Sequence, residues 1–423
     1  MSEPTRTDVC VVGGGPAGLT LALLLLRSGF TVTVLERSRS FDREFRGEIL
    51  QPGGMRLLDE LGVLRSARAA GGYELTRFQL IQNGRVDMDI DYSQLEPPFD
   101  FLLSIPQRHL LMALLAECQQ YENFVYEEGG SLTALLRSGE RVSGVAYRKD
   151  STEHQLDARC VVGADGRYSK TRKLAGIGFT RQEAFAHDVL WFRVPRPADQ
   201  PPYVRVYRAE GNPVLAYDSY PDALQLGWTL PHRGYREVSA EGIGYVREQI
   251  MRAAPPFADA VRSAVQDLRD LTLLDVFAGY ADIWAIDGLV LIGDSAHTHG
   301  PMGAQGINLA IQDAVLLHPS LVAALQANHE GVGVLSSYER RRRPEIDAIS
   351  ALQARQSRAL LARSAVGDRV RPFVMRALAH TPVYGKILRR IAYGPSRTVL
   401  RSDLFHAGLP HSPVAPTTRK AIQ

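Results

Sequence analysis

Residues 9–36 read VCVVGGGPAGLTLALLLLRSGFTVTVLE, and this stretch decides the fold. The apolar run 9–12 predicts a buried strand, residues 19–26 predict a helix, and residues 31–35 predict a second strand. A strand, a tight turn, a helix and a second strand in this order indicate the first βαβ unit of an α/β protein.

The turn between the first strand and the helix carries the pattern Gly-x-Gly-x-x-Gly. Gly13 allows the sharp turn, Gly15 lets the backbone approach a pyrophosphate, and Gly18 lets the helix pack closely on the strand, with Ala17 beside it. The first turn of the helix offers unpaired N–H groups and a partial positive charge to phosphates. The pattern therefore predicts a dinucleotide site, without separating FAD from NAD.

An acidic residue ends the second predicted strand. Glu36, followed by Arg37, stands about 20 residues beyond the turn, where a carboxylate binds the ribose hydroxyls of a dinucleotide. We expect Glu36 to hold the adenosine ribose.

Composition places the chain among ordinary globular proteins. It has 423 residues, enough for two or three structural units, and its formal net charge of +3 implies no nucleic-acid partner. Cys10, Cys118 and Cys160 lie far apart without metal-ligand spacing, which favours a reducing cytoplasm. The polar start leaves no room for a signal peptide, and the apolar run 19–26 is too short to span a bilayer.

A second strand–turn–helix unit lies in the middle of the chain. The segment 160–176, CVVGADGRYSKTRKLAG, predicts a strand that runs into Asp165, and a helix capped by Ser169. An acidic residue at such a turn indicates another ligand contact.

A third unit spans residues 289–317, LVLIGDSAHTHGPMGAQGINLAIQDAVLL. It predicts a strand over 289–292 and a helix over 305–317 whose first residues are Gly306, Ile307 and Asn308. The N–H groups of this helix start can face an anion such as the pyrimidine edge of a reduced flavin. Asp294 could accept a hydrogen bond from a ribitol hydroxyl.

Two histidines in the same unit do not predict a metal site. His297 and His299 lack an evident third ligand, so we expect no metal here.

Residues 180–270 differ in pattern from the rest. The runs 189–194, 203–207, 214–220 and 224–230 alternate as in an antiparallel sheet, with covering helices near 237–253 and 256–268. Residues 78–81 and 86–90 predict a hairpin around Asn83-Gly84. Core packing is the ordinary role of aromatic residues in such a sheet, but some could line a substrate pocket together with Met302: Tyr203, Tyr207, Tyr217, Tyr220 and Trp228.

The chain from residue 338 is helical and basic. It predicts a helix that covers the domain junction, with contact to a membrane surface as the alternative. The last residues, 411–423, are expected to be disordered.

Three motifs taken together resemble the single-component FAD-dependent aromatic hydroxylases, the group of para-hydroxybenzoate hydroxylase and the ubiquinone-pathway hydroxylases. The motifs are GGGPAG, GADGRYSKTR and LIGDSAHTHGPMGAQGINLAIQD. The resemblance covers residues 7–345 and implies non-covalent FAD. It places Arg46 between FAD and the nicotinamide cofactor and Gln107 at a FAD contact. It also places Pro301 over the flavin and substrate, and makes Arg172 a candidate contact for a nicotinamide phosphate. No catalytic side chain is implied.

The resemblance also implies a fold and its division into domains. We expect a Rossmann-like FAD-binding domain of the glutathione reductase type, with an inserted antiparallel-sheet substrate domain and C-terminal helices. The expected bounds are 1–72, 101–180 and 272–340 for the FAD-binding domain, 73–100 and 181–271 for the substrate domain, and 341–410 for the covering helices.

The implied activity is that of a cytoplasmic FAD-dependent monooxygenase. NADPH or NADH and O2 would serve to hydroxylate or epoxidise an aromatic, phenolic or polycyclic substrate through a flavin C4a-hydroperoxide. A monomer or a homodimer, without stable membrane insertion, is expected.

Three alternatives remain open at this stage. They are a reductase of the geranylgeranyl reductase type, suggested by Arg46-Gly47-Glu48 and Pro52, a flavin-dependent halogenase, suggested by residues 226–231, and a non-enzymatic FAD-binding protein.

Overall fold

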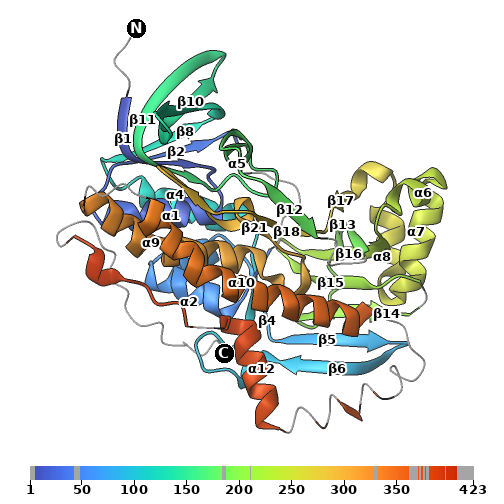
Figure 1. The fold of residues 1–423 in the computed structure, drawn as a ribbon. Coiled ribbons are helices and arrows are strands. Elements are labelled where there is room, and N and C mark those ends of the chain that lie inside the picture. The colour runs from blue at the N-terminus through green and yellow to red at the C-terminus, as the bar shows by residue number, and fades with distance from the viewer. Residues whose placement is uncertain are drawn as a thin grey trace.

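The computed structural model describes residues 5–41, 48–182, 187–209, 211–327, 332–361, 370, 373–374, 377, 381–395 and 397–406. An α/β part and a second large sheet stand side by side, and the long helix α10 extends from the first toward the second (Figure 1). The expected Arg46 contact and the expected disordered tail, 411–423, lie outside these residues.

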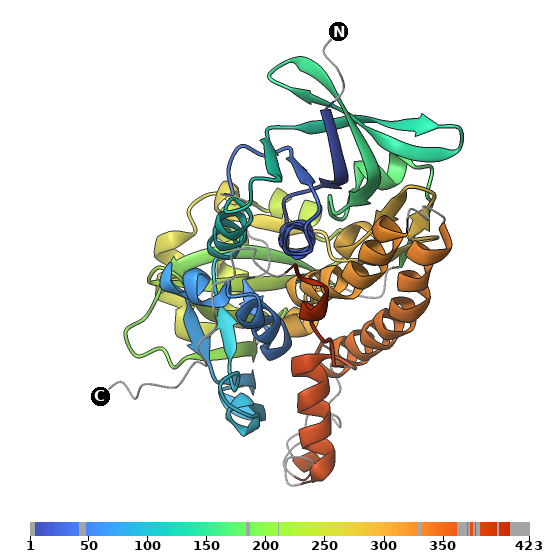
Figure 2. The same cartoon turned by 90° about the vertical axis from the view of Figure 1, so that its left-hand side faces the viewer.

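The α/β part is built on an eight-stranded sheet. Its main order is β19-β20-β11-β1-β2-β8, with β1 parallel to both neighbours, and β9 and β10 extend it as an antiparallel arm on β11. This arm projects at the top of Figure 2. The strands are β1 Thr5–Val12, β2 Val32–Glu36, β8 Phe124–Glu128, β9 Ser131–Ser138, β10 Arg141–Lys149, β11 Thr152–Gly163, β19 Ala285–Ile286 and β20 Leu289–Leu291.

Apolar helices cover this sheet. Helix α1 is apolar on nearly every face, which requires burial on all sides, and it packs against both α4 and α9. Helix α9 is long and apolar enough to cross a membrane, but 78% of its most apolar window is buried inside the protein. The helices are α1 Pro16–Arg27, α4 Gln107–Cys118, α9 Gly306–Gln326 and α10 Val332–Leu361.

The second large sheet has seven strands in the order β17-β13-β16-β15-β14-β5-β6. The prediction of an antiparallel sheet is correct for every strand pair except one, since β14 and β5 run parallel. Helices α6, α7 and α8 cover one face (Figure 1). The elements are β5 Arg77–Gln82, β6 Arg85–Asp91, β13 His187–Pro195, β14 Tyr203–Arg208, β15 Val214–Ser219, β16 Ala223–Pro231, β17 Thr272–Leu274, α6 Tyr235–Ala240, α7 Gly242–Ala253 and α8 Ala258–Ala264.

Two strand placements differ from the expected division. Strand β17 pairs with β13 of the second sheet, although its residues were expected in the FAD-binding part. Strand β4 (Tyr73–Leu75) pairs with β7 (Leu102–Ser104) instead of joining the substrate sheet. Both differences arise because strand pairing depends on long-range contacts that short apolar runs do not specify.

Two three-stranded sheets complete the structure, in the orders β3-β7-β4 and β12-β18-β21. Helices α2 and α3 are separated by a turn at Gly62, where φ is +72°. The remaining elements are β3 Ile49–Leu50, β4 Tyr73–Leu75, β7 Leu102–Ser104, β12 Phe179–Gln182, β18 Ala278–Ala281, β21 His297–Thr298, α2 Pro52–Glu60, α3 Leu64–Ala69, α5 Lys170–Leu174 and α12 Pro382–Tyr393.

Candidate functional site

The three glycines after β1 differ in their surroundings. A Cβ on Gly13 would lie 2.4 Å from the Ala164 carbonyl oxygen, and one on Gly18 would lie 2.0 Å from the Gly13 carbonyl oxygen. A Cβ on Gly15 would meet nothing within 4 Å. Gly13 and Gly18 are therefore needed for packing, while Gly15 faces open space at the start of α1, and this arrangement fits a dinucleotide pyrophosphate.

Glu36 lies beside this turn at the end of β2. Its side chain accepts hydrogen bonds from the backbone N–H groups of Gly14 and Ser38, each at 2.9 Å, and only 3% of the residue is exposed. Arg37 beside it is exposed, and Ala17 is buried in α1. The backbone contacts fix the carboxylate at the glycine turn, where a ribose would lie.

Asp165 organises the turn after β11. Its carboxylate accepts hydrogen bonds from the Thr171 N–H at 2.9 Å, the Thr171 hydroxyl at 3.0 Å and the Ser169 hydroxyl. Ser169 caps α5 as predicted, by accepting from the Arg172 N–H. These bonds make Asp165 a support of the loop that contacts Gly13.

Arg172 does not occupy the position expected of a nicotinamide contact. It is only 4% exposed, and its Nη1 donates to the Ser295 carbonyl at 2.7 Å while its Nη2 donates to the Arg167 carbonyl at 3.0 Å. The guanidinium also lies 4.0 Å from the centre of the Phe179 ring. These contacts correct the expectation, because they bury Arg172 in the structure of the loop.

Asp294 is instead partly accessible. Its carboxylate accepts a hydrogen bond from Arg167 Nε at 3.1 Å, and 32% of its side chain is exposed. A partly exposed carboxylate shortly after β20 is consistent with the predicted ribitol contact.

The loop before α9 has positive φ at two residues, Gly303 with φ of +71° and Ala304 with φ of +49°, and only Ala304 is strained by it. Asn308 holds this loop, since its side chain donates to the Ala304 carbonyl at 2.7 Å and accepts from the Gln51 N–H at 2.9 Å. The Asn308 side chain therefore has a structural role, whereas the predicted cofactor contact of this helix start is made by backbone N–H groups and stays a prediction. Gly306 is exposed.

The remaining expected residues lie around this loop. Pro301 is half-buried and precedes the short helix 302–304, Ile307 is buried in the core, and Gln107 is half-buried at the start of α4. The Met302 side chain lies outside the described part of the structure.

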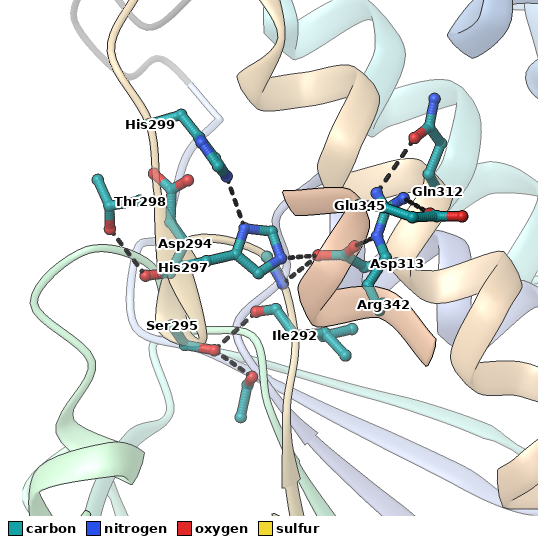
Figure 3. Close-up of polar contacts among 12 residues, drawn as sticks. Ile292, Asp294, Ser295, His297, Thr298, His299, Gln312, Asp313, Arg342 and Glu345 are labelled. Carbon is teal, nitrogen blue, oxygen red and sulfur yellow. Dashed lines mark hydrogen bonds and ion pairs between the residues drawn. The ribbon is translucent and has the colours of Figure 1, made fainter. Parts of the chain in front are cut away.

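A buried ionic network anchors both ends of the loop (Figure 3). Asp313 of α9 contacts His297 Nε2 at 2.7 Å and Arg342 Nε at 2.8 Å, and it accepts a hydrogen bond from the Gly293 N–H at 2.9 Å. Nδ1 of His297 lies 2.8 Å from Nε2 of His299. Both histidines are thus engaged in hydrogen bonds, and the described residues contain no group of three or more metal-ligating side chains.

Burial opposes ionisation of Asp313, but the positive charges of His297 and Arg342 outweigh it and lower the pKa of Asp313 to about 2. Burial lowers the pKa of His299 well below its ordinary value, and the neighbouring His297 adds to this effect. His299 is therefore neutral near pH 7.

The aromatic residues of the second sheet separate onto two faces. Trp228 and Tyr207 pack with α7 and α8, and Tyr203 shares their face because side chains alternate along β14. Tyr217 lies on the opposite face, in a cluster with Trp191 and with Ala304 of the loop. Trp228 and Tyr203 therefore lie on the face away from the loop, and Tyr217 faces the side of the loop.

Sequence reasoning missed three residues on that face. Trp191 packs edge-on against Tyr217, with 6.1 Å between the ring centres. Arg193, two residues further along β13, forms an ion pair with the buried Glu48. Alternation along β13 could have placed Trp191 and Arg193 on one face, but nothing in the sequence indicated that Glu48 would meet them.

Comparison with known proteins agrees with this geometry. Residues 6–352 match the family described as FAD binding domain. The chain is 51% identical over 409 residues to the 6-methylpretetramide 4-monooxygenase of Streptomyces rimosus, covering 97% of each chain.

Solved structures show the same fold. The p-nitrophenol 4-monooxygenase of Pseudomonas putida superimposes with a TM-score of 0.78 at 19% identity, over 93% of this chain and all of that one. The anhydrotetracycline hydroxylase of Streptomyces rimosus superimposes with a TM-score of 0.73 at 24% identity, over 94% of this chain and 78% of that one.

One assignment follows from the glycine turn with its fixed acidic residue, from the match over most of the chain and from the shared fold. The chain belongs to the FAD-dependent monooxygenases of the aromatic hydroxylase type.

Proposed function

We propose that this enzyme adds one oxygen atom to a polycyclic aromatic substrate of the 6-methylpretetramide type. The observation that carries the proposal is 51% identity over 97% of both chains to the 6-methylpretetramide 4-monooxygenase. The cluster of Trp191, Tyr217 and Ala304 between the second sheet and the loop before α9 supports it, because flat aromatic walls suit a fused-ring ligand.

Each part of the FAD site has a distinct task in this proposal. The turn at Gly15 and the start of α1 bind the diphosphate, and Glu36 holds the adenosine ribose. Asp294 accepts a hydrogen bond from a ribitol hydroxyl, and the N–H groups at the start of α9 face the pyrimidine edge of the flavin ring.

When bound, FAD takes electrons from NADPH or NADH and delivers one oxygen atom of O2 to the substrate. The protein holds the substrate ring in place and excludes water. The apolar cluster suits this task, since Trp191 is 8% exposed and Tyr217 is 4% exposed.

The direct test is oxidation of NADPH and of NADH by the FAD-loaded protein in air, with and without 6-methylpretetramide. Stimulated oxidation and a product heavier by one oxygen atom, labelled when isotopic O2 is used, would support the proposal. Product formed without O2 would favour the reductase alternative, and a brominated product in the presence of bromide would favour the halogenase alternative.

We also infer a monomer or homodimer that works in the cytoplasm without nucleic acid and without stable membrane insertion. Supporting observations are the three buried, unbridged cysteines and the burial of α9. Sedimentation of the purified protein and fractionation of producing cells would test this inference.

A further inference from the structure

A basic tract without acidic residues lies near the end of the chain. Residues 369–402 contain eight Lys and Arg side chains and no Asp or Glu. The rest of the chain has 41 basic and 46 acidic residues, which gives it a net charge of −5. The excess of positive charge therefore belongs to this basic tract, and a one-signed tract of this kind indicates an interaction with negative charge.

Helix α12, Pro382–Tyr393, lies inside the basic tract and has two different faces. Tyr384, Leu388 and Ala392 recur at every fourth residue and are buried against the body of the protein. The helix projects at the lower end of the molecule (Figure 2). Its buried face holds α12 in place, so that the opposite face is presented to solvent.

The outward face of α12 carries apolar and basic side chains together. Val383 is 52% exposed, and Ile387, one turn further along, is 39% exposed. Lys386 and Arg390 flank this pair and are exposed, and neither forms an ion pair within the part of the chain that the structure describes. The four side chains form one stripe along the helix, because they lie three, four and seven residues apart.

The surroundings leave the positive charge of this face largely uncompensated. Arg389, at the edge of the stripe, pairs with Glu96 at 3.1 Å, but 64% and 82% of the two side chains are exposed, so the pair is screened by water. Phe373 and Val374, which precede α12 in the basic tract, are 67% and 54% exposed. Exposed apolar side chains beside cations indicate a docking surface.

This combination of side chains selects among possible partners. A nucleic acid would pair with the cations but would offer nothing to Val383 and Ile387. A two-fold contact with a second copy would bring two basic tracts together, and like charges repel. A bilayer with anionic phospholipids offers phosphate groups to Lys386 and Arg390 and acyl chains to the apolar pair.

We propose that α12 docks on a membrane surface that contains anionic phospholipids. Lys386 and Arg390 contact the lipid phosphates, and Val383 and Ile387 enter the boundary between headgroups and acyl chains. A helix of 12 residues is too short to cross a bilayer, so the docking is peripheral and reversible. It does not depend on the proposed function, and its test requires no turnover.

The test measures binding of the FAD-loaded protein to vesicles by flotation. One set of vesicles contains phosphatidylcholine alone, and the other contains equal parts of phosphatidylcholine and phosphatidylglycerol. Wild type should bind the anionic vesicles and should be released by high salt, because the cations act through a screened attraction. Binding to the neutral vesicles should be weaker by about tenfold or more.

Two double variants separate the two contributions. K386Q/R390Q should bind the anionic vesicles about 10- to 30-fold more weakly, since each cation contributes about a factor of five at such a surface. Its matched control is R137Q/R236Q, which removes the same charge from two exposed arginines outside the basic tract and should bind like wild type.

V383Q/I387Q should also weaken binding by about tenfold or more, because its side chains cannot enter the acyl boundary. M112Q is the control, since Met112 is 58% exposed on α4. FAD content and circular dichroism show that each variant is folded.

A fluorescent side chain reports the position of the helix directly. The three native tryptophans are buried, so I387W adds an exposed indole whose emission should shift to shorter wavelength with anionic vesicles. M112W should show no shift.

Binding to neither kind of vesicle, equal binding to both, or equal losses in K386Q/R390Q and R137Q/R236Q would overturn the inference. Full binding by V383Q/I387Q would also overturn it, since the contact would then be electrostatic alone. A dimer that V383Q/I387Q dissociates, without vesicle binding, would assign this face to a second copy instead.

Discussion

Nε2 of His297 lies 2.7 Å from Oδ2 of Asp313, and both side chains are almost completely buried. This contact joins the loop after β20 to the middle of α9, and Arg342 extends it to α10. The loop expected over the flavin is therefore held by ionic contacts from two core helices.

The D313N variant should be strongly destabilised. Removing one partner of a buried ionic cluster costs about 3–5 kcal/mol, since Arg342 and His297 lose their counter-charge. Thermal unfolding measures the effect. The matched control is D287N, because Asp287 pairs with Arg141 but is 38% exposed, and its loss should cost about 1 kcal/mol or less. Equal stability of the two variants would contradict the role given to Asp313.

His318 should make the protein sensitive to mild acid. Burial lowers its pKa from 6.5 to about 4, and its Nε2 lies 2.8 Å from the Ser28 hydroxyl. Because the unfolded chain takes up the proton first, stability should fall as the pH drops from 6.5 toward 4, by up to about 3 kcal/mol. The free energy of unfolding, measured with urea at several pH values across this range, should depend less steeply on pH for H318Q than for wild type. An equal pH dependence in the two proteins would disprove the assignment.

Two glycine variants should separate packing from cofactor binding. G18A should fail to fold, because its methyl group would lie 2.0 Å from the Gly13 carbonyl oxygen. The methyl group of G15A would meet nothing within 4 Å, so the FAD-free protein should keep its stability. FAD should bind more weakly by a factor of about ten or more. The measurements are unfolding of the FAD-free protein and flavin titration. A G15A protein with wild-type FAD affinity would refute the pyrophosphate contact.

D294A should reduce the FAD content of the purified protein. Loss of a hydrogen bond to a charged group weakens binding by about 10- to 100-fold. The flavin absorbance per protein measures the content, and D259N, an exposed acid on α8, is the control. A D294A protein that purifies with full FAD would exclude the ribitol contact.

The two faces of the second sheet predict different results for two tryptophan variants. W191F should weaken binding of the polycyclic substrate by about 3- to 10-fold, because Trp191 packs on the loop-facing side. W228F should lower stability by about 1–3 kcal/mol with unchanged substrate affinity, because Trp228 is buried under the covering helices. The reverse result would place the pocket on the other face.

The sequence by itself determined the features that depend on neighbouring residues. The glycine turn, the acidic end of β2, the Ser169 cap and the Asn83-Gly84 hairpin follow from local backbone preferences, which operate wherever the segment lies. These local units predicted a dinucleotide site, and their order along the chain carried the resemblance that implied the FAD-binding fold.

Only the tertiary structure decided which residues meet across the molecule. Glu48 and Arg193 are 145 residues apart in the chain, and Asn308 reaches Gln51 across 257 residues. Tertiary packing also decides that Arg172 is buried, that β14 pairs in parallel with β5 and which face of the sheet Trp228 takes. Such contacts arise from the packing of sheets and helices against one another, and a residue's local sequence does not record which partner the fold will bring to it.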